Sequence, residues 1–240
     1  MNDSNAATIP LNYETPPPPP PKAPVRGRWV LPLLTIASTT AAAIMYYRGL
    51  TSRLEAISFV TGAICVWLTV RENVWNFPVS LLNVATFAIV FFNAGLLADA
   101  GLQVVYIILT LIGWYMWLWG GQRHTALRVS RVSLLELSIV LASCLSLTAI
   151  LWKAVTFAGG VSPFFDAITT ALSLCAQWLL NRKRLENWFF WIAADLIYIP
   201  LYAYKHLYLT SILYATFFLM CLMGNWQWQT TWRAQRAGAP

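Results

Sequence analysis

WLTVRENVWN occupies residues 67–76, and WLLNRKRLEN, residues 178–187, matches it 111 positions further on. The two stretches share Trp, Leu, Arg and Asn at equivalent places. The same offset aligns residues 55–119 with residues 166–230 without a gap. Further identities include Gly113 with Gly224 and Trp117 with Trp228. Because these residue types seldom recur together by composition alone, we predict an internal repeat, which constrains the fold more than any single segment does.

The repeat lies in a chain built from apolar stretches separated by short charged loops. Each stretch has about 17–25 residues, enough for a helix to cross a hydrocarbon core of ~30 Å. We predict spans at residues 29–47, 54–70, 75–93, 100–119, 134–156, 164–181, 187–204 and 208–228.

Composition supports a membrane protein. The chain has 240 residues, of which 58% are hydrophobic and 10% charged, whereas soluble domains are about 45–50% apolar and about 25% charged. A water-soluble fold of this composition would lack the polar surface to cover its core. The cysteines all lie inside apolar runs, where they are typical small core side chains. Composition thus excludes a soluble enzyme, a disordered chain and a secreted disulfide scaffold, and predicts an all-α polytopic membrane protein.

The order of the spans predicts the architecture. Residues 54–120 and 164–230 form two three-helix repeats, and the span at residues 134–156 links them. Because one span intervenes, both repeats cross the membrane in the same direction, which predicts a 3+1+3 arrangement of seven core spans in parallel repeats. Substrate sites of such folds lie near the middle of the membrane, between the repeats. Residues 29–47 add an N-terminal span, or lie on the membrane surface.

Residues 1–28 form a separate, polar segment with six consecutive prolines. Polyproline favours an extended chain without backbone hydrogen bonds, so we expect a disordered cytoplasmic tether. A proline-rich docking motif is the alternative interpretation.

The charges of the loops predict the orientation. With eight crossings, twelve Lys and Arg residues fall on one face and four on the other. The richer face holds Lys22, Arg26, Arg28, Arg71, Arg123, Arg128, Arg131, Arg182, Lys183, Arg184, Arg233 and Arg236. The positive-inside rule makes this face cytoplasmic, with both termini inside. The net charge of +7 therefore reflects membrane topology, and we expect no nucleic-acid partner.

Motifs of enzymatic chemistry are missing from the sequence. We find no Walker-type glycine loop, no Gly-x-Ser-x-Gly and no His-x-x-x-His or carboxylate cluster. We expect no enzymatic activity, no metal and no cofactor.

Polar side chains inside the spans indicate where a ligand binds, because burying them in hydrocarbon costs free energy unless a partner or a cavity receives them. Such residues are Asn83, Gln103, Gln177, Asp195, Tyr198 and Tyr214. Asp195 lies about eight residues from either end of its predicted span. An intramembrane carboxylate marks a functional site more often than a packing contact.

One helical face of residues 187–204 combines amide, aromatic and acidic groups. Asn187, Trp188, Trp191 and Asp195 share this face at spacings of three or four residues. Aromatic rings attract a cation at about 0.5–2 kcal/mol each, and a carboxylate neutralises it. The face therefore predicts a cage for a flat, cationic aromatic ligand. Tryptophans near span ends fit an interfacial belt instead. These are Trp114, Trp117, Trp119, Trp226, Trp228 and Trp232.

At these residues the chain resembles the PnuC-type nicotinamide riboside transporters. Residues 74–84 (VWNFPVSLLNV), 95–99 (GLLAD) and 102–106 (LQVVY) resemble the first half of that family. Residues 163–166 (PFFD), 186–188 (ENW) and 207–210 (LYLT) resemble the second half. The resemblance covers residues 54–230 and leaves out the tail and the first span.

The resemblance implies a bacterial inner-membrane facilitator, homotrimeric, that passes nicotinamide riboside down its gradient. It implies that Asn83, Gln103, Asn187 and Trp188 contact the ligand. Asp195 stands where some members have Asn, and a carboxylate suits a pyridinium or a thiazolium alike. Thiamine or another vitamin precursor is therefore an alternative substrate, and a non-transporting membrane scaffold that recruits a partner through the proline-rich tail is the second alternative. Deleting residues 1–28 would separate them, because a facilitator should keep transporting.

The charge distribution makes a testable prediction of topology. Tags at residues 1 and 240 should both be inaccessible to membrane-impermeant reagents in intact cells, whereas a tag near residues 94–98 should be labelled. An externally accessible C-terminus would overturn the predicted orientation.

Overall fold

The computed structural model describes residues 29–93, 97–160, 162–204 and 208–237. The predicted tail at residues 1–28 lies outside the described residues. Within them the chain forms eight α-helices, one short 3-10 turn and no strand. The helices are α1 (Val30–Tyr47), α2 (Arg53–Val70), α3 (Asn76–Asn93), α4 (Leu97–Trp119), α5 (Leu134–Phe157), α6 (Pro163–Asn181), α7 (Asn187–Tyr204) and α8 (Tyr208–Ala237), with the 3-10 turn at Gln122–His124.

Each predicted span is a helix in the structure. The largest difference is in α8, which continues to Ala237 instead of ending at residue 228. The added residues include Gln, Arg and Ala, which are strong helix formers in water. Hydropathy thus marks the end of the apolar stretch and not the end of the helix.

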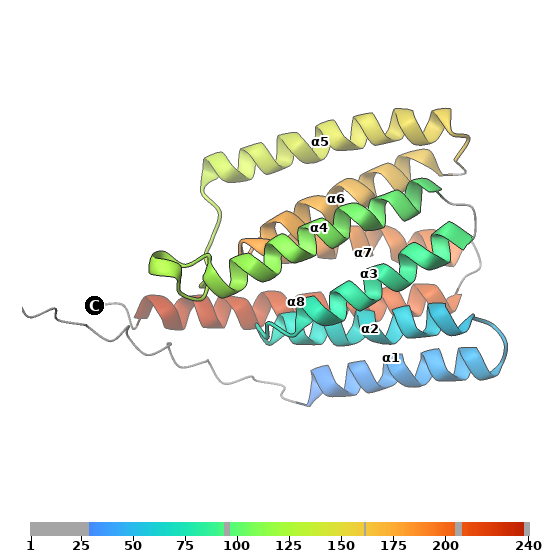
Figure 1. Ribbon diagram of the computed structural model, residues 1–240, viewed down its shortest axis with the longest axis horizontal. Coiled ribbons are helices and arrows are strands. Elements are labelled where there is room, and N and C mark those ends of the chain that lie inside the picture. Colours follow the sequence, from blue (N-terminus) through green and yellow to red (C-terminus); the bar gives the residue numbers. More distant parts are fainter. Residues whose placement is uncertain (1–28, 94–96, 161, 205–207, 238–240) are drawn as a thin grey trace, which may run out of the picture.

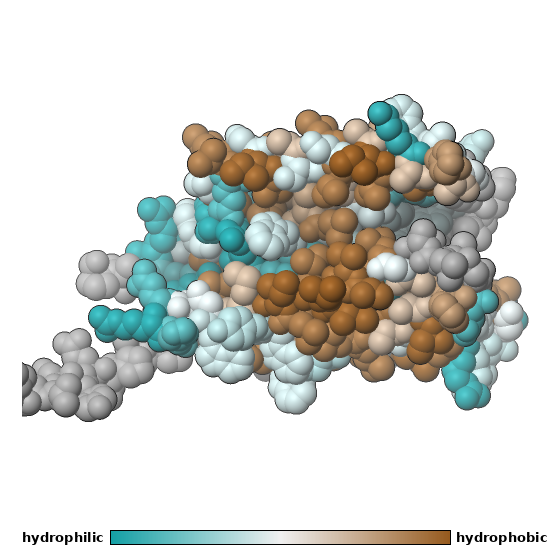
Figure 2. All heavy atoms as spheres, turned by 45° about the horizontal axis from the view of Figure 1, so that its top comes forward, coloured by the Kyte–Doolittle hydropathy of each residue, from teal (hydrophilic) through white to brown (hydrophobic). Residues whose placement is uncertain are grey.

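Four helices are long and apolar enough to cross a membrane, judged by length and composition: α1, α3, α4 from Ala100 onward, and α5. Within the described residues α2 contributes a shorter apolar stretch, Ala56–Val70. The crossing of α2, α6, α7 and α8 stays a prediction. Figure 2 shows hydrophobic side chains in a broad band across the middle of one face, with hydrophilic ones toward the two ends. This distribution is typical of a membrane-embedded bundle.

The helices run roughly along one direction, with α1 and α5 at opposite outer edges (Figure 1). Helices that follow one another within α1–α4 and within α5–α8 pack together, and α1 also contacts α8. Two long-range contacts join the predicted repeats, α2 with α8 and α4 with α6. At the 111-residue offset α2 corresponds to α6 and α4 to α8. The two long-range contacts are therefore equivalent to each other.

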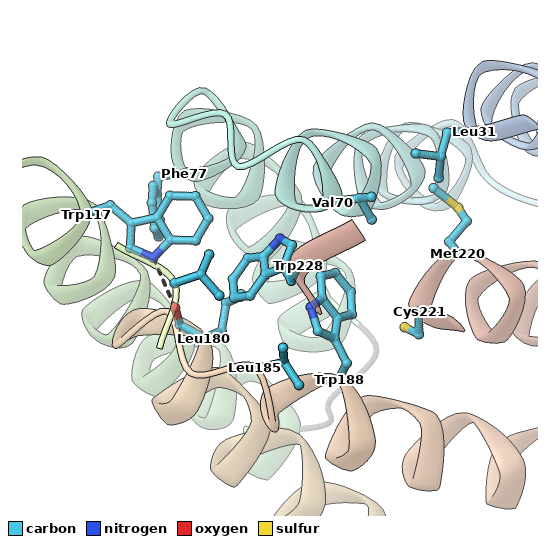
Figure 3. Packing of buried hydrophobic residues seen from close by; sticks show 11 residues of the cluster. Leu31, Val70, Phe77, Trp117, Leu180, Leu185, Trp188, Met220, Cys221 and Trp228 are labelled. Carbon is cyan, nitrogen blue, oxygen red and sulfur yellow. Dashed lines mark hydrogen bonds between the residues drawn. The ribbon is translucent and has the colours of Figure 1, made fainter. Parts of the chain in front are cut away.

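Two tryptophans carry this correspondence into the core. Trp117 of α4 donates its indole N–H to the Leu180 carbonyl at 3.0 Å, and Trp228 of α8 donates to the Thr69 carbonyl at 3.2 Å. Donors and acceptors are both related by the same offset. The two indole rings also pack together, with centroids 5.9 Å apart. Figure 3 shows Trp228 in the middle of the buried cluster and Trp117 at its side, next to Phe77.

The interfacial position predicted for Trp117 and Trp228 is wrong, because their side chains are only 3% and 0% exposed. Trp119 and Trp226 are well exposed, as an interfacial belt requires. Both kinds of tryptophan lie near a helix end, and only the direction around the helix axis separates them.

The turns beyond this cluster are joined by charge. Glu72 and Lys183, themselves 111 residues apart, form an ion pair of 3.3 Å. Both residues have a left-handed backbone, with φ of 52° and 48°, a conformation typical of the residue after a helix C-terminus. Lys183 also lies over the Trp117 ring, 4.4 Å from its centroid. The turns after α2 and α6, which correspond at the 111-residue offset, thus meet, and the opposite charges of their side chains neutralise each other.

Removing an indole N–H should loosen the bundle. Trp228→Phe and Trp117→Phe should each lower the free energy of unfolding by at least about 1 kcal/mol, the usual net value of one hydrogen bond, and further through the space left in the core. Thermal unfolding in detergent measures the effect. Trp226→Phe is the matched control, since Trp226 is 40% exposed. Equal midpoints for all three variants would contradict the role given to the buried pair.

Candidate functional site

A cavity of about 330 Å³ lies inside the bundle. Its described walls come from α2, α3, α4, α6, α7 and α8, the six helices of the two predicted repeats. Its volume falls within the ~300–1,000 Å³ of small-molecule sites. The structure thus provides a ligand-sized space between the two halves of the chain.

Eight of the nine side chains predicted to bind a ligand line this cavity. They are Asn83, Gln103, Gln177, Trp188, Trp191, Asp195, Tyr198 and Tyr214. Asn187 does not line it. Its buried amide lies at the first residue of α7, where Nδ2 donates to the Arg184 carbonyl at 2.6 Å and Oδ1 has no partner. That these residues contact a ligand stays a prediction.

Asn83 is held by hydrogen bonds to α2. Its Nδ2 donates to the Ser58 carbonyl and, at 3.0 Å, to Thr61 Oγ1. The Thr61 hydroxyl donates its own proton along the helix to the Ile57 carbonyl at 2.8 Å, so toward Asn83 it acts as the acceptor. The protein therefore uses both N–H groups of Asn83 and leaves Oδ1 as an acceptor at the cavity.

Gln177 likewise donates an N–H group to the protein and keeps its side-chain oxygen free of described donors. Its Nε2 donates to Asn181 Oδ1 at 3.0 Å, and within the described chain no donor is hydrogen-bonded to its Oε1. Asn83 and Gln177 thus approach the cavity from α3 and α6 with their oxygens available. The site is suited to a ligand that brings N–H or O–H donors.

Asp195 adds a negative charge to this acceptor-rich wall. Its side chain is 6% exposed and forms no ion pair with any described residue. Its described polar neighbour is the Cys221 thiol. Burying a carboxylate is costly unless a counter-charge approaches it, and the cavity leaves room for one.

Aromatic rings complete the enclosure. Tyr198, Tyr202 and Tyr214 form a stack with centroids 4.6–5.7 Å apart, and Trp188 and Trp191 approach from the same helix as Asp195. The predicted combination of aromatic faces with a carboxylate is therefore present around one space. This arrangement favours a flat cation.

The cavity walls follow the 111-residue offset closely. Twenty of the twenty-two lining residues form ten pairs at this offset. The chemistry of several pairs differs between the halves. Such pairs are Val66 with Gln177, Ser80 with Trp191, Asn83 with Ala194, Val84 with Asp195 and Gln103 with Tyr214. Positions that correspond at this offset thus line the cavity with an unequal set of side chains.

The described lining lacks basic side chains. No Lys, Arg or His occurs among the lining residues that the structure describes. Across the described chain no group of three or more His, Cys, Asp or Glu side chains could hold a metal ion.

Sequence reasoning missed several polar groups around the cavity. Ser80, Tyr106, Thr110 and Ser173 line it, and Asn181 lies directly behind Gln177. Serine, threonine and tyrosine are common in membrane helices and carry little signal of their own. The Gln177–Asn181 pair did carry one, because two amides four residues apart on an apolar helix face each other.

Known membrane transporters resemble this chain in sequence and in fold. The family model described as nicotinamide mononucleotide transporter matches residues 52–230. The nicotinamide riboside transporter PnuC of Escherichia coli (strain K12) is 27% identical over 203 residues, which cover 74% of this chain and 85% of that protein. The riboflavin/roseoflavin transporter RibM of Streptomyces davaonensis is 26% identical over 182 residues, 72% of this chain and 83% of that protein.

A solved structure shares the fold. It is described as the crystal structure of the vitamin B3 transporter PnuC and matches this chain with a TM-score of 0.66 at 21% identity. The match covers 85% of this chain and 92% of that one. At this identity the likeness shows a common helical architecture.

Gly224 should be required for the shape of the cavity. A Cβ at this position would lie 2.5 Å from ring atoms of Trp188, so Gly224→Ala must displace that ring, at a cost of about 1–3 kcal/mol typical of overpacking. We expect reduced uptake of nicotinamide riboside, the compound named for the relatives, measured with radiolabel in cells. Gly101→Ala is the control, because nothing lies within 4 Å of the added carbon. Equal uptake by both variants would contradict the prediction.

Proposed function

We propose, because the chain belongs to the nicotinamide mononucleotide transporter family, that it carries nicotinamide riboside across the bacterial inner membrane by facilitated diffusion. The family consists of membrane transporters and not of enzymes. The observation that carries the choice of substrate is the buried Asp195, which faces a ligand-sized cavity without a cationic partner among the described residues.

The chemistry of nicotinamide riboside complements this cavity. Its pyridinium ring is flat and cationic, which suits Asp195 and the faces of Trp188 and Trp191. Its carboxamide and ribose hydroxyls supply N–H and O–H donors. These can bond to the side-chain oxygens of Asn83 and Gln177, which the hydrogen bonds of the described chain leave available. A neutral ligand would leave the carboxylate without a counter-charge.

The same walls disfavour phosphorylated forms. A phosphate would meet the Asp195 carboxylate and amide oxygens, and no Lys or Arg lines the described cavity. An uncompensated dianion at membrane depth is very costly. We therefore propose that the substrate is the riboside and not the mononucleotide.

Thiamine is the second candidate, since Asp195 would also neutralise its thiazolium. Titration of the purified protein with nicotinamide riboside, nicotinamide mononucleotide, thiamine and riboflavin tests the assignment. We expect nicotinamide riboside to bind most tightly. If thiamine binds more tightly instead, thiamine would be the proposed substrate.

We further infer the finer architecture. The equivalent contacts of α2 with α8 and α4 with α6 support parallel 3+1+3 repeats, and the twelve-to-four distribution of basic residues supports cytoplasmic termini. Asp195 is the sole acid among the described lining residues, which supports uniport over coupling through two acids. The homotrimer rests on the family resemblance.

The counter-charge role of Asp195 is directly testable. Asp195→Asn should weaken nicotinamide riboside binding by about 1–3 kcal/mol, the value of a hydrogen bond to a charged group. It should hardly affect the reduced, uncharged dihydropyridine analogue. Calorimetry on the purified protein measures both. Asp166→Asn is the matched control, because Asp166 lies in the first turn of α6 and not among the lining residues. Equal losses for the two ligands would indicate a packing role.

A further inference from the structure

Asn181, the last residue of α6, lies outside the cavity and behind one of its walls. Its side chain is 0% exposed, and it is not among the lining residues. Both ends of its amide are nevertheless used. Nδ2 donates to the Leu109 carbonyl of α4 at 2.7 Å, and Oδ1 accepts from Gln177 Nε2 at 3.0 Å.

The direction of these bonds is fixed by one group. A backbone carbonyl can only accept, so Asn181 must present its NH₂ group to Leu109. Its oxygen then points to Gln177, which must in turn present an N–H. The remaining atom of the Gln177 amide, Oε1, is therefore held as an acceptor at the cavity wall.

Packing holds Asn181 in this place. A Cβ at Gly113, one turn beyond Leu109 on α4, would lie 2.2 Å from Asn181 Oδ1. Glycine at this position lets α4 approach α6 closely enough for the amide to bridge them. At the 111-residue offset the counterparts of Gln177 and Asn181 are Val66 and Val70, so the device belongs to one half of the chain alone.

We propose that Asn181 is a positioning residue for ligand recognition: it orients the Gln177 amide so that Oε1 accepts a hydrogen bond from an N–H or O–H of the ligand. The inference rests on the proposed function, because the donor is a carboxamide N–H or ribose hydroxyl of nicotinamide riboside. Without Asn181 the Gln177 amide can rotate and present an N–H to that donor.

A double-mutant cycle in dissociation constants for nicotinamide riboside tests the proposal. Asn181→Ala and Gln177→Ala should each weaken binding by about three- to tenfold, as loss of one hydrogen bond does. The double variant should bind no worse than Gln177→Ala, because Asn181 acts through Gln177. A merely structural role would give additive losses. Asn181→Ser, whose short hydroxyl cannot bridge both partners, repeats the test with less empty space.

Asn225→Ala is the matched control. It breaks the same kind of bond, Gln229 Nε2 to Asn225 Oδ1 at 3.2 Å, on α8 and outside the cavity lining. Its dissociation constant should equal that of the unmodified protein.

Each outcome decides the matter. Failure of the unmodified protein to bind nicotinamide riboside would overturn the proposed function and this inference with it. If the unmodified protein binds nicotinamide riboside, two results would overturn the inference alone. One is unchanged affinity in Gln177→Ala or in the folded Asn181 variants, and the other is additive losses in the double variant.

Discussion

The two hydrogen bonds from indole N–H groups to backbone carbonyls hold the halves of the bundle in register. Trp117 reaches from α4 to the last turn of α6, and Trp228 reaches from α8 to the last turn of α2. Inside hydrocarbon no water competes for these groups, so each donor needs its acceptor. The contacts of α4 with α6 and of α8 with α2 close the bundle around the cavity.

Within that frame the described cavity lining is short of positive charge and presents free carboxylate and amide oxygens. Asn83 donates both of its N–H groups to the protein and Gln177 donates one, which leaves both amide oxygens as acceptors. Asp195 has no cation beside it within the described chain. A ligand that brings a positive charge to Asp195 and donors to the two amide oxygens would relieve the cost of burying these groups. This selects for a cation rich in hydroxyls and against an anion.

Much of this could be predicted from sequence because lipid leaves a polar side chain few places to go. Amides and a carboxylate in the middle of apolar stretches had to face inward, and Asn83, Gln177 and Asp195 do line the cavity. The 111-residue offset likewise predicted equivalent positions. Residues near helix ends were harder, since position along the chain does not give direction around the axis. Trp117 and Trp228 were therefore assigned to the interface, although they are buried.

The pairing of wall positions bears on how such a protein changes over evolutionary time. A gene duplication leaves every wall position in two copies, and afterwards each copy can mutate alone while its twin preserves the shape. Val84 and Asp195 are one such pair, and Ser80 and Trp191 are another. The two halves therefore offer a ligand different groups, the Asp195 carboxylate from one and the Asn83 and Gln103 amides from the other. A new vitamin could be accommodated by exchanging side chains within a pair, with the helix packing inherited intact.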